Sequence, residues 1–237
     1  MEFICTKCGR KEPVTTRAAH CACGGLWRLA YEPPKFDLAE IDRNEWSLFR
    51  YRRFLALDDE SWRSVSMGEG MTPVVRLDDN VLLKMDYFMP TLSFKDRGAA
   101  TLIAHCKSIG VQQVVQDSSG NAGNAVAAYC ARSGIGCEIF VPEGTSPKKI
   151  DMIRAHGAVC TVVPGTRDHC ADVCREKVER EGVYYANHVY NPFFYEGTKT
   201  YIYEVFEQLG RIPANLVIPV GNGTLFLGAM YALEHLL

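Results

Sequence analysis

The residue best suited to covalent chemistry is the lysine of the segment Ser-Phe-Lys-Asp-Arg-Gly at residues 93–98. Lys95 comes just before apolar residues at helical spacing, and Gly110 is expected to end that helix. An amine held at the mouth of a helix can form a Schiff base with an aldehyde if its pKa is low enough to make it nucleophilic. The alternative is an ordinary solvated lysine in a first helical turn.

Two polar, glycine-containing loops have the composition of anion sites. Residues 117–124 read Asp-Ser-Ser-Gly-Asn-Ala-Gly-Asn, and residues 221–224 read Gly-Asn-Gly-Thr. Each is expected to follow a strand and to open a helix, so that backbone N–H groups and the helix dipole would face an anion. Neither matches a Walker loop or the pattern G-x-G-x-x-G. Such turns also occur without a ligand, so neither loop identifies a site by itself.

Four cysteines near the N-terminus have spacing that favours a metal site. Cys5 and Cys8 form C-x2-C, and Cys21 and Cys23 form C-x-C, which is one residue shorter than the usual second pair. Four thiolates suit tetrahedral zinc, and four protein ligands would make the ion structural because no position stays open for water. The alternative is four reduced thiols in an N-terminal strap.

Beyond these motifs, the sequence alternates between apolar strands and helices. The expected strands are 81–85, 111–116, 137–141, 159–163, 183–186 and 216–220. The expected helices are one beginning near Lys95, then 122–133, one opening at 146–147 and ending at 157, 167–181, 197–209 and one from 224 onward. This alternation predicts an α/β fold with parallel sheets covered on both faces, in which ligands bind at the carboxyl ends of the strands.

Composition narrows the function classes. The chain has 237 residues, 47% of them hydrophobic, and a formal net charge of -2, so no basic field for nucleic acid is present. The N-terminus does not read as a signal peptide, and no apolar run approaches the ~20 residues of a membrane helix. We therefore expect a cytoplasmic protein that binds neither nucleic acid nor membrane, with its cysteines reduced or bound to metal.

Four segments, in their order along the chain, resemble the fold-type II pyridoxal-phosphate enzymes. They are Gly-Glu-Gly-Met-Thr-Pro at 68–73, Pro-Thr-Leu-Ser-Phe-Lys-Asp-Arg-Gly at 90–98, Ser-Ser-Gly-Asn at 118–121 and Gly-Asn-Gly-Thr at 221–224. Within that group the chain is most similar to the threonine synthases, many of which carry an N-terminal cysteine knuckle. Leu92 and Leu225 depart from the family, which often has glycine and asparagine there.

The resemblance implies two parallel-type sheet domains of the tryptophan synthase β-like fold. The implied division is a cysteine knuckle and extension at 1–64, a large cofactor-binding domain at 65–110 with 185–237, and a small α/β domain at 111–184. Since family members run on past the position of residue 237, we expect the large domain to be incomplete at its C-terminus.

The resemblance also implies the residues of the site. Lys95 would hold pyridoxal 5'-phosphate as a Schiff base and then transfer protons, Asn121 would bond the ring hydroxyl, and 221–224 would hold the phosphate. The implied cofactor-binding residues are Phe94, Lys95, Asn121, Gly221, Asn222, Gly223, Thr224 and Leu225. The implied substrate-binding residues, which would take the α-carboxylate, are Ser118, Ser119, Gly120 and Asn121.

The implied activity is that of a lyase that converts O-phosphohomoserine and water to threonine and phosphate, in amino-acid biosynthesis. The alternatives are another enzyme of the same fold, such as a threonine or serine dehydratase or a cysteine or cysteate synthase-like β-replacement enzyme, and a truncated relative without activity. The implied partners are a small amino-acid substrate and a second copy of the chain in a homodimer.

Overall fold

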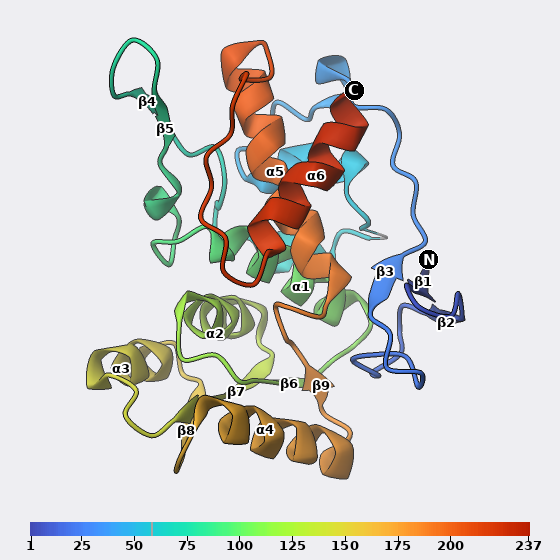
Figure 1. Cartoon of the computed structure of the whole chain (residues 1–237), viewed down its shortest axis with the longest axis vertical. Helices are drawn as coiled ribbons and strands as arrows, with labels where there is room; N and C mark the ends of the chain where they lie inside the picture. Colours follow the sequence, from blue (N-terminus) through green and yellow to red (C-terminus); the bar gives the residue numbers. More distant parts are fainter. Residues whose placement is uncertain (58) are drawn as a thin grey trace.

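A four-stranded parallel sheet forms the lower part of the computed structural model, which describes residues 1–57 and 59–237 (Figure 1). Its strand order is β8-β7-β6-β9. Helices α2 and α3 cover one face and α4 covers the other (Figure 1). The strands are β6 (Gln113–Gln116), β7 (Gly136–Pro142), β8 (Val159–Val163) and β9 (Tyr184–Tyr185), and the helices are α2 (Asn121–Ser133), α3 (Pro147–Ala155) and α4 (Arg167–Glu181).

The inner strands explain why this sheet is parallel and covered on both faces. Val114, Val115 and Gln116 are consecutive residues of β6 and are fully buried. In β7, Ile139 and Val141 are also fully buried. A run buried on both sides is the pattern of a strand between two helical layers. Because β6 and β9 are parallel neighbours, with Val114 opposite Tyr184, their carboxyl ends open at the same edge.

Three long helices form the upper part of the molecule (Figure 1). They are α1 (Lys95–Ser108), α5 (Pro192–Leu209) and α6 (Thr224–Leu236), and α5 packs against the other two. Glycines let these helices approach closely. A Cβ added at Gly197 would lie 1.9 Å from the carbonyl oxygen of Arg97, and one at Gly228 would lie 2.4 Å from Thr198 Oγ1.

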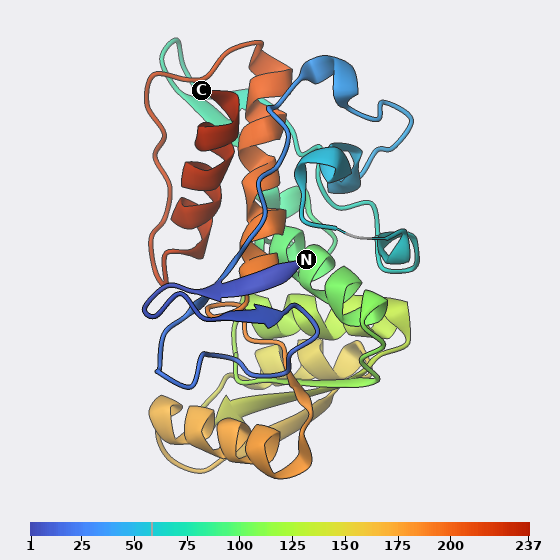
Figure 2. The same cartoon turned by 90° about the vertical axis from the view of Figure 1, so that its right-hand side faces the viewer.

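The N-terminal part begins with a small antiparallel sheet of order β2-β1-β3, drawn in blue near the lower end of α5 (Figure 2). Phe3 of this sheet contacts Phe193 of α5 with ring centroids 5.9 Å apart. A two-stranded antiparallel hairpin, β4-β5, follows further along the chain. The bounds are β1 (Glu2–Cys5), β2 (Lys11–Pro13), β3 (Trp27–Leu29), β4 (Val74–Arg76) and β5 (Leu82–Lys84), with 3-10 turns η1 (Leu38–Glu40), η2 (Leu48–Phe54), η3 (Ser61–Ser64) and η4 (Asp86–Phe88).

The α/β class with a parallel sheet is confirmed, and the predicted bounds 159–163 and 167–181 are those observed. The predicted strand 216–220 is wrong. The segment pairs with none of the described strands, and Val217 is 98% exposed. The predicted strand 81–85 pairs antiparallel with β4 rather than in a parallel sheet. None of the helices in the described part of the chain is both long and apolar enough to cross a membrane.

Gly197 provides a stability test of the close contact between α1 and α5. Alanine normally stabilises a helix relative to glycine by roughly 0.5–1 kcal/mol. At residue 197 we expect the opposite, a loss of about 2 kcal/mol or more in the free energy of unfolding, because the two backbones must separate. Urea denaturation measures the change. Gly136→Ala is the control, since its Cβ would meet its nearest neighbour at 3.4 Å. A Gly197→Ala protein as stable as the wild type would contradict the packing described.

Candidate active site

A cleft of about 320 Å³ lies where the carboxyl ends of β6 and β9 meet the amino ends of α1, α2 and α6. It brings together all the predicted cofactor- and substrate-binding residues except Ser119. A larger cavity of about 530 Å³ lies between residues 27–35 and the helices α5 and α6, and contains none of them. The cleft is lined by Phe94, Lys95, Ser118, Gly120, Asn121, Ala122, His188, Pro219, Gly221, Asn222, Gly223, Thr224 and Leu225.

Lys95 is the first residue of α1 and points its amine into this cleft. Its Nζ lies 4.7 Å from the ring centre of Phe94, 5.5 Å from that of Phe194 and 3.4 Å from Thr224 Oγ1. No carboxylate of the described residues forms an ion pair with it. Burial therefore lowers the pKa of Lys95 to about 8 without a compensating charge. A large share of the amine is then neutral and nucleophilic near pH 8.

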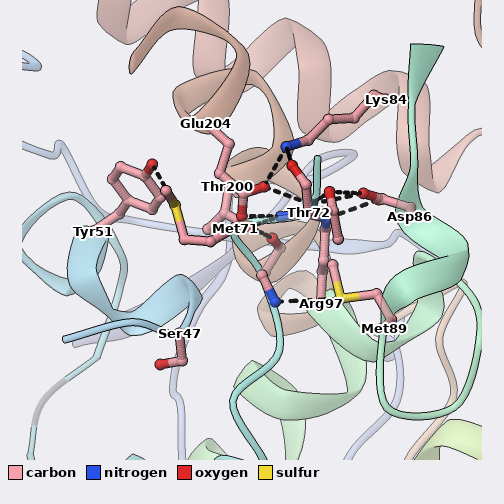
Figure 3. Close-up of polar contacts among 12 residues, drawn as sticks. Ser47, Tyr51, Met71, Thr72, Lys84, Asp86, Met89, Arg97, Thr200 and Glu204 are labelled. Carbon is pink, nitrogen blue, oxygen red and sulfur yellow. Dashed lines mark hydrogen bonds and ion pairs between the residues drawn. The ribbon is translucent and has the colours of Figure 1, made fainter. Parts of the chain in front are cut away.

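A buried ion cluster fixes the helical turn that carries Lys95 (Figure 3). Arg97 donates to Asp86 through Nε and Nη2 at 2.9 and 2.8 Å, and to Glu204 through Nη1 and Nη2 at 2.5 and 2.8 Å. Thr72 and Thr200 accept two further bonds, and Lys84 lies 2.7 Å from Glu204. Burial alone would raise the pKa of Glu204, but Arg97 and Lys84 lower it to about 2. Two cations thus balance two carboxylates inside the protein.

The loop before Lys95 is closed by Asp96. The carboxylate of Asp96 accepts from the backbone N–H and the hydroxyl of Thr91, at 2.9 and 2.7 Å. Between them Leu92 takes a φ of +65°, in the left-handed region that glycine adopts most easily. This φ is a conformational reason for the glycine that the resemblance leads us to expect at this position, and leucine is strained there.

The amino end of α2 forms a second wall of the cleft. Asn121 is the first residue of the helix, and Ser118 Oγ accepts from the backbone N–H of Gly120 at 3.3 Å. A Cβ at Gly123 would lie 2.0 Å from the carbonyl oxygen of Ser118, so only glycine lets the loop fold this tightly against the helix. Ser119 belongs to the same turn but does not line the cleft.

The loop at 221–224 leads into α6 and leaves open space in front of it. A Cβ added at Gly221 or Gly223 would meet no described atom within 4 Å. Gly223 has a φ of +85°, so a side chain there would strain the backbone whether or not an anion is bound. Asn222 Oδ1 accepts from the N–H and hydroxyl of Thr224, at 3.2 and 3.0 Å. The open space and the amino end of α6 fit a phosphate.

His188 lines the cleft and is not among the predicted site residues, whereas Asp117 begins the predicted loop at 117–124. Asp117 follows β6 and accepts from Tyr185 at 2.6 Å, from Asn187 at 3.1 Å and from Arg167 at 2.8 Å. Burial would raise the pKa of Asp117, but the bonds from Tyr185 and Arg167 lower it overall. The signal in the sequence that could have identified His188 is its position just after the predicted strand 183–186, because ligands bind at the carboxyl ends of parallel strands.

The predicted clustering of the four N-terminal cysteines is confirmed. The Sγ atoms of Cys5, Cys8, Cys21 and Cys23 all lie within 4.8 Å of one another. Cys5 and Cys23 are 3.5 Å apart, and Cys8 and Cys21 are 3.7 Å apart. A tetrahedral ion with Zn–S bonds of about 2.3 Å would need sulfurs about 3.8 Å apart. The geometry fits zinc, whose presence stays a prediction.

The family profile described as "Pyridoxal-phosphate dependent enzyme" matches residues 65–237. The threonine synthase of Methanocaldococcus jannaschii is 33% identical over 232 residues, covering 92% of this chain and 57% of that protein. The threonine synthase of Halalkalibacterium halodurans is 36% identical over 183 residues, covering 74% and 51%. The chain thus spans about half the length of the curated relatives it matches.

Solved structures support the fold. Holo diaminopropionate ammonia lyase from Escherichia coli superposes with a TM-score of 0.67 at 19% identity, covering 89% of this chain and 62% of that one. Maize serine racemase superposes with a TM-score of 0.66 at 24% identity, covering 76% and 58%. At these identities the likeness is one of fold alone.

The cysteine cluster predicts one bound zinc ion. Protein purified without chelator should contain about one equivalent of zinc by elemental analysis, since four thiolates already lie at ligand spacing. Cys8→Ser should lose most of the metal and lower the melting temperature. Cys137→Ser, outside the cluster, should retain it. Less than about a tenth of an equivalent in wild-type protein, with all four thiols open to titration, would refute the prediction.

Proposed function

The chain belongs to the pyridoxal-phosphate-dependent enzyme family, and from this premise we propose that it is a lyase of the threonine synthase type. The proposed reaction converts O-phosphohomoserine and water to threonine and phosphate. The observation that carries the proposal is the cleft itself, in which an unpaired, desolvated Lys95 faces two helix amino ends. The names of the two threonine synthases that the chain matches support the choice of reaction.

The residues of the cleft fit the cofactor. We assign the covalent bond with its aldehyde carbon to Lys95, its phosphate to residues 221–224 and the amino end of α6, and its ring hydroxyl to Asn121. Open space in front of Gly221 and Gly223 supports the phosphate assignment. When bound, pyridoxal phosphate supplies an electron sink that stabilises negative charge at the substrate's α carbon.

The chain's own groups would bind the substrate and move its protons. Ser118, Ser119 and Gly120, with the amino end of α2, take the α-carboxylate. Lys95 Nζ takes a proton from the α carbon and, after passing that proton on, takes one from the β carbon. Phosphate then leaves from the γ carbon, which gains a proton to become the methyl group. Water adds its hydroxyl at the β carbon, its other proton goes to the released phosphate, and Lys95 returns a proton to the α carbon. An amine with a pKa of about 8 suits both accepting and returning a proton near neutral pH.

One observation favours a second candidate within the family. Among the described residues that line the cleft, Lys95 is the one that carries a cationic side chain, whereas O-phosphohomoserine brings a phosphate dianion as well as a carboxylate. A dehydratase or a β-replacement enzyme would need no second cation.

The division into segments 1–64, 65–110 with 185–237, and 111–184, the homodimer and the cytoplasmic location remain predictions. The division and the homodimer accompany the proposed function because they were inferred from the same resemblance, whereas the cytoplasmic location was inferred from the composition and the N-terminal sequence. Comparing the activities of the protein on O-phosphohomoserine, threonine and O-acetylserine separates the candidate reactions. We expect threonine and phosphate from O-phosphohomoserine, with no 2-oxobutyrate from threonine and no acetate from O-acetylserine.

Lys95 should be the one lysine that bonds the cofactor. After incubation with pyridoxal phosphate and borohydride reduction, peptide mass spectrometry should find the adduct at Lys95, and Lys95→Ala should abolish it. Because the lowered pKa leaves the amine neutral above about 8, the initial rate of adduct formation should rise with pH through that value and level off above it.

Lys148→Ala serves as the control for that experiment, because Lys148 is an exposed residue of α3 and does not line the cleft. It should leave the adduct at Lys95 unchanged. An adduct recovered mainly at another lysine, or wild-type protein with none, would overturn the proposed function.

A further inference from the structure

His188 is a buried polar residue of the cleft that has no assigned partner. The residue is 9% exposed, and its Nδ1 atom has no hydrogen-bond partner in the described part of the protein. It lines the cleft with Lys95, Ser118 and Asn121. Leaving a buried polar atom without a partner is unfavourable, so Nδ1 is expected to have one in the working protein.

The position of His188 is fixed by the neighbouring residue. Asn187 Nδ2 donates to Asp117 Oδ1 at 3.1 Å, and Asn187 Oδ1 accepts from the N–H groups of Val189 and Tyr190 at 2.7 and 3.2 Å. The turn containing His188 is therefore tied to the residue that precedes Ser118. The imidazole packs edge-on against Phe194, with ring centres 5.7 Å apart.

The imidazole is suited to a neutral hydrogen bond. Burial, and secondly the charge of Lys95, lowers the pKa of His188 to about 3. The ring is then uncharged in the neutral range, with one nitrogen that donates and one that accepts. Such a group can recognise a hydroxyl or ester oxygen without adding a charge to the cleft.

The other polar groups of the cleft have roles under the proposed function, on which this inference rests. The 221–224 loop takes the cofactor's phosphate, the amino end of α2 takes the α-carboxylate, and Lys95 moves protons. The remaining group of a substrate is the oxygen on its side chain. We propose that His188 is a substrate-binding residue that hydrogen-bonds this oxygen, so that the site selects amino acids with an oxygen-bearing side chain.

Two variants of equal shape test the proposal. Leucine and asparagine have the same branching at Cγ. His188→Leu removes every hydrogen-bonding atom of the side chain, whereas His188→Asn places an amide atom where Nδ1 lies. The protein loaded with pyridoxal phosphate is titrated by calorimetry with L-threonine and with L-2-aminobutyrate, which lacks the hydroxyl. Adduct formation at Lys95 and melting temperature are measured for each variant.

We expect His188→Leu to weaken the binding of L-threonine by about tenfold, equivalent to about 1.4 kcal/mol, and to leave that of L-2-aminobutyrate within about twofold. His188→Asn should restore at least half of the effect on a logarithmic scale. Both variants should form the Lys95 adduct as the wild type does.

The possible failures are distinguishable. If both variants bound L-threonine and L-2-aminobutyrate more weakly by the same factor, His188 would contribute to the shape of the cleft alone, and the inference would be overturned. Unchanged affinity of His188→Leu for L-threonine would also overturn it. Either result with a normal Lys95 adduct leaves the proposed function intact. Wild-type protein without the adduct overturns the proposed function, and the inference with it.

Discussion

Arg97 is fully buried, and its guanidinium binds carboxylates from two segments far apart in the sequence, Asp86 and Glu204 (Figure 3). Removing a charge from water is expensive, and removing one partner of a buried pair typically costs about 3–5 kcal/mol. The cluster therefore strongly favours one arrangement of α1, α5 and the segment before α1. Lys95 lies two residues before Arg97, in the same helical turn, so its position depends on these ion pairs. The same pairs engage both carboxylates, and Lys95 is desolvated and has no counterion among the described residues.

Close backbone packing brings the other walls of the cleft to Lys95. Gly197 lets α5 contact the carbonyl of Arg97, and Gly228 lets α6 contact α5, so the amino end of α6 comes within reach of the amine. On the opposite side, parallel pairing of β6 and β9 opens their following loops at one edge. Asp117 then links the two loops through Asn187. Two separate interactions thus form the cleft: the packing of α1, α5 and α6 against one another, and the parallel pairing of β6 with β9.

Much of this organisation is predictable from sequence because it follows local patterns. The alternation of strands and helices and most of the cleft residues are in this class. α5 begins at Pro192 instead of the predicted 197, because Gly197 reads locally as a helix boundary while its actual role is a contact with Arg97. His188 was missed for a similar reason: its burial and its unpartnered atom come from a strand pairing that periodicity does not reveal. The segment 216–220 has the composition of a strand, but strand formation needs a neighbour.

The claim that the Arg97 cluster keeps Lys95 unpaired and desolvated is tested by the titration of that amine. The rate at which acetic anhydride modifies Lys95 is followed against pH by mass spectrometry in wild type, Arg97→Lys and Arg97→Met, with Lys177→Met as a control on the ion pair with Glu138. The midpoint should lie near 8 in wild type and control. In the Arg97 variants it should move toward the ordinary lysine value of about 10.4, because the first turn of α1 loosens and the amine becomes hydrated. Folded Arg97 variants whose Lys95 midpoint stays near 8 would contradict it.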